Sequence, residues 1–138
     1  MDRMVKTAIM LLLLVSPPLA NAKGLDTNID ETLAKCTDSV PQRSSAEMAA
    51  CYNTAVDAWQ AEIDKQLQLM MQDRTENELS ALKKMQTAWV EYKKSSFQAL
   101  DVIFSDQQQW PDGPEINAFF KMIFLSKQAR QLSENYFR

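Results

Sequence analysis

The stretch QTAWVEYK (residues 86–93) lies midway along the longest uninterrupted helical pattern in the chain. Around it, large apolar side chains recur in steps of three to five residues, which keeps them near one side of a helix with 3.6 residues per turn. These positions are Leu82, Met85, Trp89, Tyr92, Phe97, Leu100 and Phe104. Trp89 and Tyr92 have the most surface to remove from water, so we expect both in the core, with partner helices around them.

A more regular helical pattern precedes this one, over about residues 45–72. Its apolar positions follow a spacing of three and four: Met48, Cys51, Tyr52, Ala55, Trp59, Ile63, Leu67 and Met70. Capping-box sequences stand before both helices, at residues 44–47 and 75–78. Because only a few residues separate the two helices, we expect an antiparallel hairpin in which Trp59, Ile63 and Leu67 face Leu82, Met85 and Trp89.

Shorter helical patterns flank the hairpin. Asp26 or Thr27 is suited to cap a first helix through Leu33 and Cys36, and a last helix is expected from Glu115 onward. The segment WPDGP (110–114) separates this last helix from the third, which we expect to end between residues 104 and 109. No strand-like alternation occurs in the sequence. The predicted fold class is therefore all-α, a small helical bundle with a long antiparallel helix hairpin plus a C-terminal helix.

The first 22 residues have the features of a cleaved signal peptide. Arg3 and Lys6 precede an apolar run over residues 8–15, which is too short to span a bilayer, and residues 20–22 (ANA) form a small-x-small cleavage site. We expect residues 23–138 to form a single helical domain, secreted or periplasmic, without stable membrane insertion.

Two cysteines, Cys36 and Cys51, are the only ones in the chain. In an oxidising compartment an even count favours a disulfide, and a closed loop of about 15 residues contributes on the order of 3 kcal/mol. A redox-active pair is the alternative, but the spacing is far from Cys-x-x-Cys.

The composition argues against several classes of function. With 18 acidic and 15 basic residues and a net charge of −3, the chain lacks the basic excess of a general nucleic-acid binder. It contains no histidine, which removes the commonest general base and zinc ligand. No acidic residue falls on an apolar helix face, where burial would raise its pKa for acid–base work. We therefore expect no enzyme, no catalytic residues, no metal and no cofactor.

One connecting segment has the composition of a protein-binding loop. Residues 101–115 contain acidic side chains and no basic one, with Trp110 beside a rigid PDGP turn. An acidic loop with an aromatic anchor suits a cationic cleft, so the predicted partner-binding residues are Asp106, Trp110, Asp112 and Glu115. In the alternative interpretation Trp110 folds back onto the bundle and the acids keep the connection soluble. A second candidate surface is the helix face that carries Lys83 and Lys94.

Cys36, Cys51, the segment AWQAEID (58–64) and the QTAWVEYK stretch together resemble the LprI-like lysozyme-inhibitor family of small secreted helical proteins. Gln86 and Trp89 match the family's Gln-x-x-Trp segment, and Arg130 resembles its closing Leu-Thr-x-x-Arg. Lys93 and Lys94 replace an Arg-Asp pair, and apolar residues replace a second cysteine pair. The resemblance implies a helical scaffold, and the predicted structural core is Trp59, Ile63, Gln86, Trp89 and Tyr92.

Three functional hypotheses follow. The first is a non-catalytic protein that binds another protein, with a cationic lysozyme-type muramidase as the partner that the resemblance implies. The second is an envelope structural or stress component, or an immunity partner of a secreted toxin, acting through the surface near Lys83 and Lys94. The third, an enzyme acting on peptidoglycan, is the least favoured because of the missing histidine.

Overall fold

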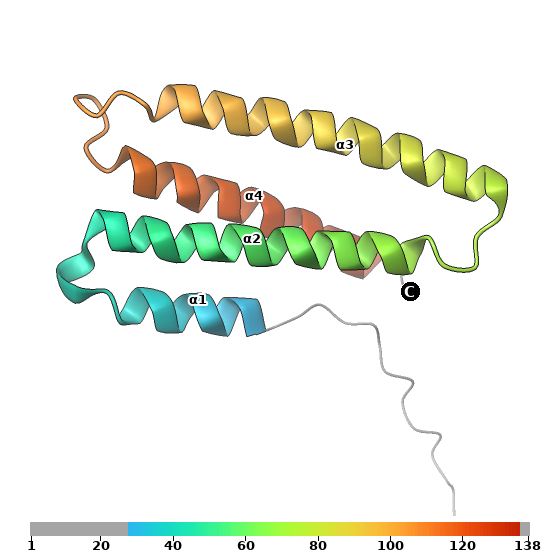
Figure 1. Cartoon of the computed structure of the whole chain (residues 1–138), viewed down its shortest axis with the longest axis horizontal. Helices are drawn as coiled ribbons and strands as arrows, with labels where there is room; N and C mark the ends of the chain where they lie inside the picture. Colours follow the sequence, from blue (N-terminus) through green and yellow to red (C-terminus); the bar gives the residue numbers. More distant parts are fainter. Residues whose placement is uncertain (1–27, 136–138) are drawn as a thin grey trace, which may run out of the picture.

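Four α-helices and one short 3-10 helix make up the part of the chain that the computed structural model describes, residues 28–135 (Figure 1). In chain order they are α1 (Asn28–Asp38), the 3-10 helix η1 (Pro41–Arg43), α2 (Ser45–Met70), α3 (Glu76–Ile103) and α4 (Gly113–Asn135). No strand occurs within these residues, so the predicted all-α fold is confirmed. The expected signal peptide and the expected cap at Asp26 or Thr27 lie outside the described residues.

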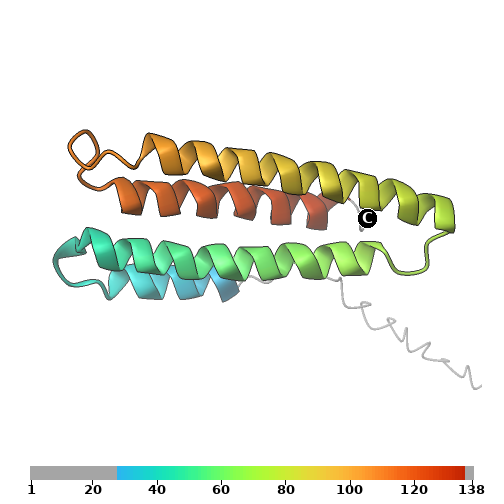
Figure 2. The same ribbon diagram turned by 45° about the horizontal axis from the view of Figure 1, so that its top comes forward.

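The centre of the bundle is the contact between α2 and α4, which run in the same direction and pack directly on each other (Figures 1 and 2). Because α4 runs parallel to α2, the chain must come back to the end of the bundle where α2 began before α4 can start. The 28 residues of α3 make this return, over about 42 Å at 1.5 Å per residue. As Figure 2 shows, α3 lies beside α4, whereas α1 lies on α2.

The core forms where the regular apolar face of α2 meets α4. Trp59 and Ile63 are fully buried, as the sequence pattern of this helix predicts. From α4, Leu125, Ala129 and Leu132 close over them. Small side chains at the crossing allow two helix backbones to approach closely, and Ala129 has no exposed surface at all.

Helix α3 contributes to the core only from its edge, which differs from the prediction. No residue along its whole length is buried. Trp89 and Gln86 are half-buried and line a gap of about 140 Å³ with residues of α2 and α4. Tyr92 is 62% exposed, so its assignment to the core is wrong. The physical reason is the topology: α4 takes the place beside α2 that the hairpin prediction gave to α3.

Tyr92 still has an aromatic neighbour at the surface of the bundle. Its ring centroid lies 5.4 Å from that of Phe124, which is also 6.3 Å from Trp89 and 5.6 Å from Phe97. An amphipathic side chain of this kind packs one part of its ring and leaves the rest in water. The position therefore fits tyrosine without being part of the buried core.

The two predicted capping boxes have different outcomes. Before α3, the backbone N–H of Glu78 donates to Thr75 Oγ1 at 3.3 Å, and the backbone N–H of Thr75 donates to Glu78 Oε2 at 2.8 Å, so this box is confirmed. The hydrogen bonds from Thr75 also hold the pKa of Glu78 below its ordinary value. Before α2, the side chain of Ser44 makes no capping hydrogen bond, and that prediction is wrong. Ser44 instead follows two residues with positive φ, and its backbone N–H donates to the carbonyl of Pro41.

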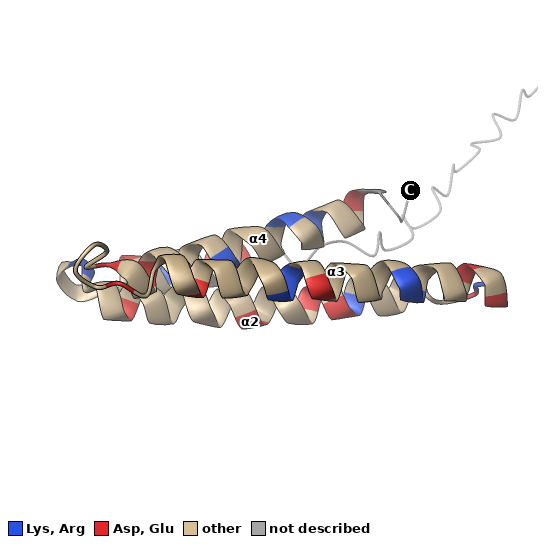
Figure 3. Cartoon of the chain, turned by 90° about the horizontal axis from the view of Figure 1, so that it is seen from above, with Lys and Arg blue, Asp and Glu red and all other residues tan. Residues whose placement is uncertain are grey.

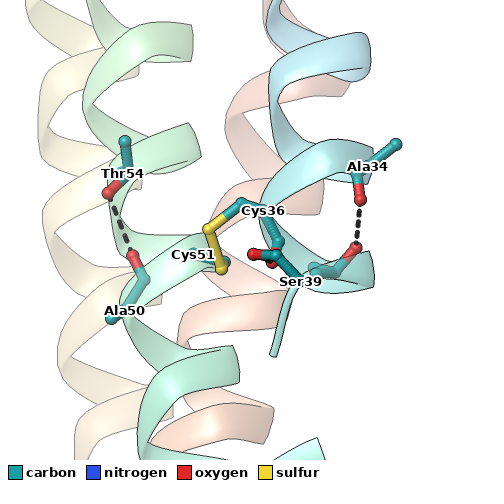
Figure 4. The surroundings of a disulfide bond; sticks show 7 residues. Ala34, Cys36, Ser39, Ala50, Cys51 and Thr54 are labelled. Atoms are coloured by element: carbon teal, nitrogen blue, oxygen red, sulfur yellow. Dashed lines mark hydrogen bonds between the residues drawn. A yellow bond between two sulfur atoms is a disulfide. The ribbon is translucent and has the colours of Figure 1, made fainter. Parts of the chain in front are cut away.

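A disulfide between Cys36 and Cys51 joins α1 to α2, as predicted (Figure 4). The two Cα atoms lie 5.7 Å apart. Helix α1 has only 11 residues and one buried side chain, Ile29, so it is too short to be stable alone in water. The bridge therefore fixes the C-terminal half of α1 to the bundle.

An exposed ion pair connects α3 to α4. Asp101 Oδ1 accepts hydrogen bonds from Lys121 Nζ at 2.6 Å and from Asn117 Nδ2 at 2.8 Å. These two donors, Lys121 first, hold the pKa of Asp101 below its ordinary value. A depressed folded-state pKa stabilises the protein above the unfolded pKa of about 4, and this contribution disappears as the pH falls through the lower folded value.

We therefore expect Asp101→Asn to lower the free energy of unfolding at pH 7 by no more than about 1 kcal/mol, because the side chain is 56% exposed and the pair is screened. The difference from wild type should shrink steadily below about pH 4. Urea unfolding curves recorded between pH 7 and pH 3 measure this. A difference that stays constant across this range would contradict the assignment of the effect to the Asp101 carboxylate.

Candidate functional site

The connection between α3 and α4, residues 104–112, is held in place by its own hydrogen bonds. Asp106 Oδ1 accepts the backbone N–H groups of Gln108 and Gln109, at 2.9 and 3.3 Å. The Asp106 carbonyl accepts the N–H of Trp110 at 2.8 Å, and the Trp110 carbonyl accepts that of Gly113 at 2.9 Å. The exposed Asp106 carboxylate thus also shapes the turn that carries Trp110.

Trp110 packs against the bundle and keeps part of its surface exposed. Its ring meets that of Phe104 edge to face, with centroids 5.3 Å apart. The chain passes very close to α3 here, because a Cβ atom on Gly113 would lie 2.4 Å from the Phe104 carbonyl oxygen. Glycine is therefore required for this approach. Trp110 thus folds back onto the bundle, as the alternative interpretation of the sequence expected. The ring is only half-buried, so part of its surface remains available for contact with a partner.

Asp112 and Glu115 flank the start of α4. Asp112 is exposed, and its carbonyl accepts the N–H of Ile116 at 3.0 Å, so it opens the first turn of the helix. Glu115 lines a groove of about 310 Å³ between α2 and α4, together with Tyr52, Ile116, Phe119 and Phe120. All four predicted partner-binding residues thus belong to one end of the bundle, where α3 ends and α4 begins (Figure 1).

Five aromatic rings extend from this loop across α4 to α2, an arrangement that was not predicted from the sequence. We call them the aromatic ladder, and successive ring centroids lie 5.3 to 5.9 Å apart in the order Trp110, Phe104, Phe120, Phe119 and Tyr52. Phe119 and Phe120 are 38% and 45% exposed. Two adjacent phenylalanines on a helix cannot both occupy a narrow buried stripe. The Phe119-Phe120 pair in the sequence therefore already indicated that an aromatic ring lies at the surface. Exposed apolar surface of this kind marks interaction sites.

The other candidate surface, around Lys83 and Lys94, is the solvent-facing side of α3. A shallow hollow here is lined by α3 residues alone, among them Lys83, Lys84 and Glu91. Figure 3 shows basic and acidic segments alternating along this helix. The surface therefore has mixed charge and does not form a basic stripe for an anionic partner.

Arg130, which resembles a family residue, and Lys93, which replaces one, connect the helices to one another. The Arg130 guanidinium lies 5.0 Å from the Trp59 ring centroid, and Arg130 Nη2 pairs with Asp30 Oδ2 at 2.7 Å, so it links α4 to both α2 and α1. Lys93 Nζ donates to Gln60 Oε1 at 2.8 Å and lies 5.6 Å from the Trp89 ring, which links α3 to α2. Their positions give them a structural role in this chain.

The described residues contain no group of three cysteine, aspartate or glutamate side chains placed to hold a metal ion. No helix among them is sufficiently long and apolar to cross a membrane. Among the described residues, the features that suit binding of a partner are the acidic loop and the aromatic ladder at one end of the bundle.

The chain was compared with known proteins. The family model described as "Lysozyme inhibitor LprI" matches residues 36–133, a range that begins at the first cysteine of the disulfide and includes all of α2 and α3 and most of α4. No curated protein and no solved structure matches the chain. Since the family model covers well over half of the sequence, the chain belongs to the LprI lysozyme-inhibitor family.

Proposed function

We propose that this protein is a non-catalytic, secreted or periplasmic domain that binds and inhibits a lysozyme-type muramidase. The observation that supports this most strongly is the match to the lysozyme-inhibitor family over residues 36–133. The apolar run near the chain start and the Cys36–Cys51 disulfide are consistent with export to an oxidising compartment. In this proposal residues 23–138 are the mature protein, which acts without a cofactor.

The proposed contact surface is the end of the bundle that carries Asp106, Trp110, Asp112 and Glu115. Asp106 and Asp112 are exposed, and residues 101–115 contain no basic side chain. A cationic muramidase is attracted to such a surface, which raises the rate of encounter and fixes the orientation of the partner. Trp110 supplies the type of large, partly desolvated side chain that contributes most to binding at protein interfaces.

We expect purified residues 23–138 to slow a cationic C-type muramidase, measured as the rate of lysis of a cell-wall suspension. Trp110→Ala should raise the inhibition constant by about tenfold or more, the loss that follows when an interface anchor is removed. A matched control is Tyr92→Ala, which removes another partly exposed aromatic ring from the middle of α3 and should leave inhibition unchanged. Circular dichroism would verify that both variants are folded. Full inhibition by Trp110→Ala would reject the site assignment.

The immunity or envelope-scaffold hypothesis makes a different prediction. It assigns binding of a toxin or an envelope scaffold protein to the α3 surface. Lys83→Glu combined with Lys94→Glu would therefore abolish binding of that partner, whereas Trp110→Ala would not. The mixed charge of that surface gives it less support than the acidic end of the bundle has. Release of fragments from purified sacculi by the wild-type protein would instead favour an enzyme.

A further inference from the structure

The groove beside Glu115 has an unusual combination of walls. Tyr52 from α2 and Phe119 and Phe120 from α4 supply aromatic surface, and Glu115 supplies a single carboxylate. The Glu115 side chain is only 20% exposed, so the surrounding rings shield much of it from water. A planar guanidinium is well matched to such a site, because it stacks on aromatic faces and pairs with a carboxylate, and it is more weakly hydrated than an ammonium group.

An arginine of the chain itself lies beside Glu115 and does not line the groove. Arg43 Nη2 is 3.9 Å from Glu115 Oε1, and the Arg43 side chain remains 77% exposed. An ion pair this long and this exposed is weak. Its length leaves room for a better-placed cation to replace Arg43.

The backbone that carries Arg43 is strained. Gln42 and Arg43 both have φ of 50°, a left-handed conformation that residues with a side chain rarely adopt. The disulfide closes the loop from residue 36 to residue 51, and this strained segment lies inside that loop. Strain of this kind concentrates at binding sites and switch regions, and here it occurs at the residue that lies beside Glu115.

We infer that this groove binds an arginine side chain presented by the protein partner, and that Arg43 occupies Glu115 in the free protein and withdraws on binding. That a muramidase supplies this arginine rests on the function proposed above. The groove adds a second contact to the one made by Trp110, since the aromatic ladder connects the two.

The first experiment measures binding of residues 23–138 to a C-type lysozyme by isothermal titration calorimetry. Glu115→Gln removes the charge and keeps the side-chain shape, and we expect it to weaken binding about tenfold. Arg43→Gln removes the competitor and should tighten binding severalfold. In the Glu115→Gln background Arg43→Gln should have no effect, because the interaction that it relieves is already absent.

Lys127→Gln is the charge control. Lys127 is exposed on α4, so its substitution changes the net charge as Arg43→Gln does without touching the groove. If Arg43→Gln tightened binding only because it makes the protein more acidic, Lys127→Gln would tighten lysozyme binding as well. The effect of Arg43→Gln would also persist in the Glu115→Gln background. Either result would overturn the inference that the partner's arginine displaces Arg43 from Glu115.

The second experiment needs no lysozyme. Amide chemical shifts of residues 23–138 are followed during addition of the capped tripeptide Gly-Arg-Gly or its Gly-Gln-Gly counterpart. A third titration uses the oligosaccharide chitotetraose, which tests whether the aromatic groove binds a sugar instead. We expect the arginine peptide alone to shift the resonances of Tyr52 and residues 115–120, and Glu115→Gln to suppress these shifts. Shifts caused by chitotetraose, or equally by the glutamine peptide, would overturn an arginine site.

The two experiments separate the inference from the function on which it rests. If wild type does not bind lysozyme and the arginine peptide still shifts the groove residues, the proposed function fails and the arginine site stands. If wild type inhibits lysozyme and the Glu115→Gln and Arg43→Gln variants bind as wild type does, the proposed function stands and the arginine site fails.

Discussion

Replacing Trp59 with alanine is expected to lower the free energy of unfolding by about 3–5 kcal/mol. Trp59 has no exposed surface and lies between α2 and α4. The substitution leaves a cavity that rigid neighbours such as Ala129 cannot fill. It also removes the ring beneath the Arg130 guanidinium. Domains of this size have a total stability of about 5–15 kcal/mol, so a large share would be lost.

Urea unfolding followed by circular dichroism measures this loss, and Trp89→Ala is the matched comparison. Trp89 is half-buried on α3, and its ring is 6.3 Å from Phe124. Its removal should therefore cost less than about 2 kcal/mol. Equal losses for the two tryptophans would contradict a core centred on α2 and α4, because they would mean that α3 is packed as tightly as α4.

The sequence was sufficient to predict which face of α2 is apolar. Spacings of three and four place Trp59 and Ile63 on one face of α2, and the structure buries both. The same periodicity does not say which helix packs on which. That choice depends on the shapes of the facing surfaces and on topology, and the small Ala129 lets α4 approach α2 where the bulky face of α3 does not. Tyr92 was misassigned for this reason.

The candidate site was predictable only where it is local in sequence. Asp106, Trp110, Asp112 and Glu115 stand within ten residues, and the acidic composition of that segment with its single tryptophan predicts a binding loop. The groove depends on Tyr52, which is distant in sequence and reaches Glu115 only because α2 and α4 are parallel neighbours. The failed capping box at Ser44 has a related cause. The positive φ of the two preceding residues belongs to the loop closed by the disulfide, and no short motif encodes it.

Removing the disulfide is the second change with a large expected effect. Replacing Cys36 and Cys51 together with alanine should lower the free energy of unfolding by about 3 kcal/mol, because a loop with a sequence separation of 15 residues is no longer closed in the unfolded chain. Alanine is preferable to serine, since Cys51 is buried and alanine adds no polar group there. Urea unfolding under oxidising conditions gives the comparison with wild type.

The loss should be concentrated in α1. This helix has one buried residue, and the ion pair that joins it to α4, between Asp30 and Arg130, is exposed. Without the bridge, amide hydrogen exchange should become fast in α1 while α2 and α4 stay protected. Ser39→Ala is the local control, because it removes only an exposed hydrogen bond to the Cys36 carbonyl and should cost less than about 0.5 kcal/mol. If exchange instead accelerated equally in all four helices, α1 would be an integral part of the core, and the bridge would stabilise the bundle as a whole.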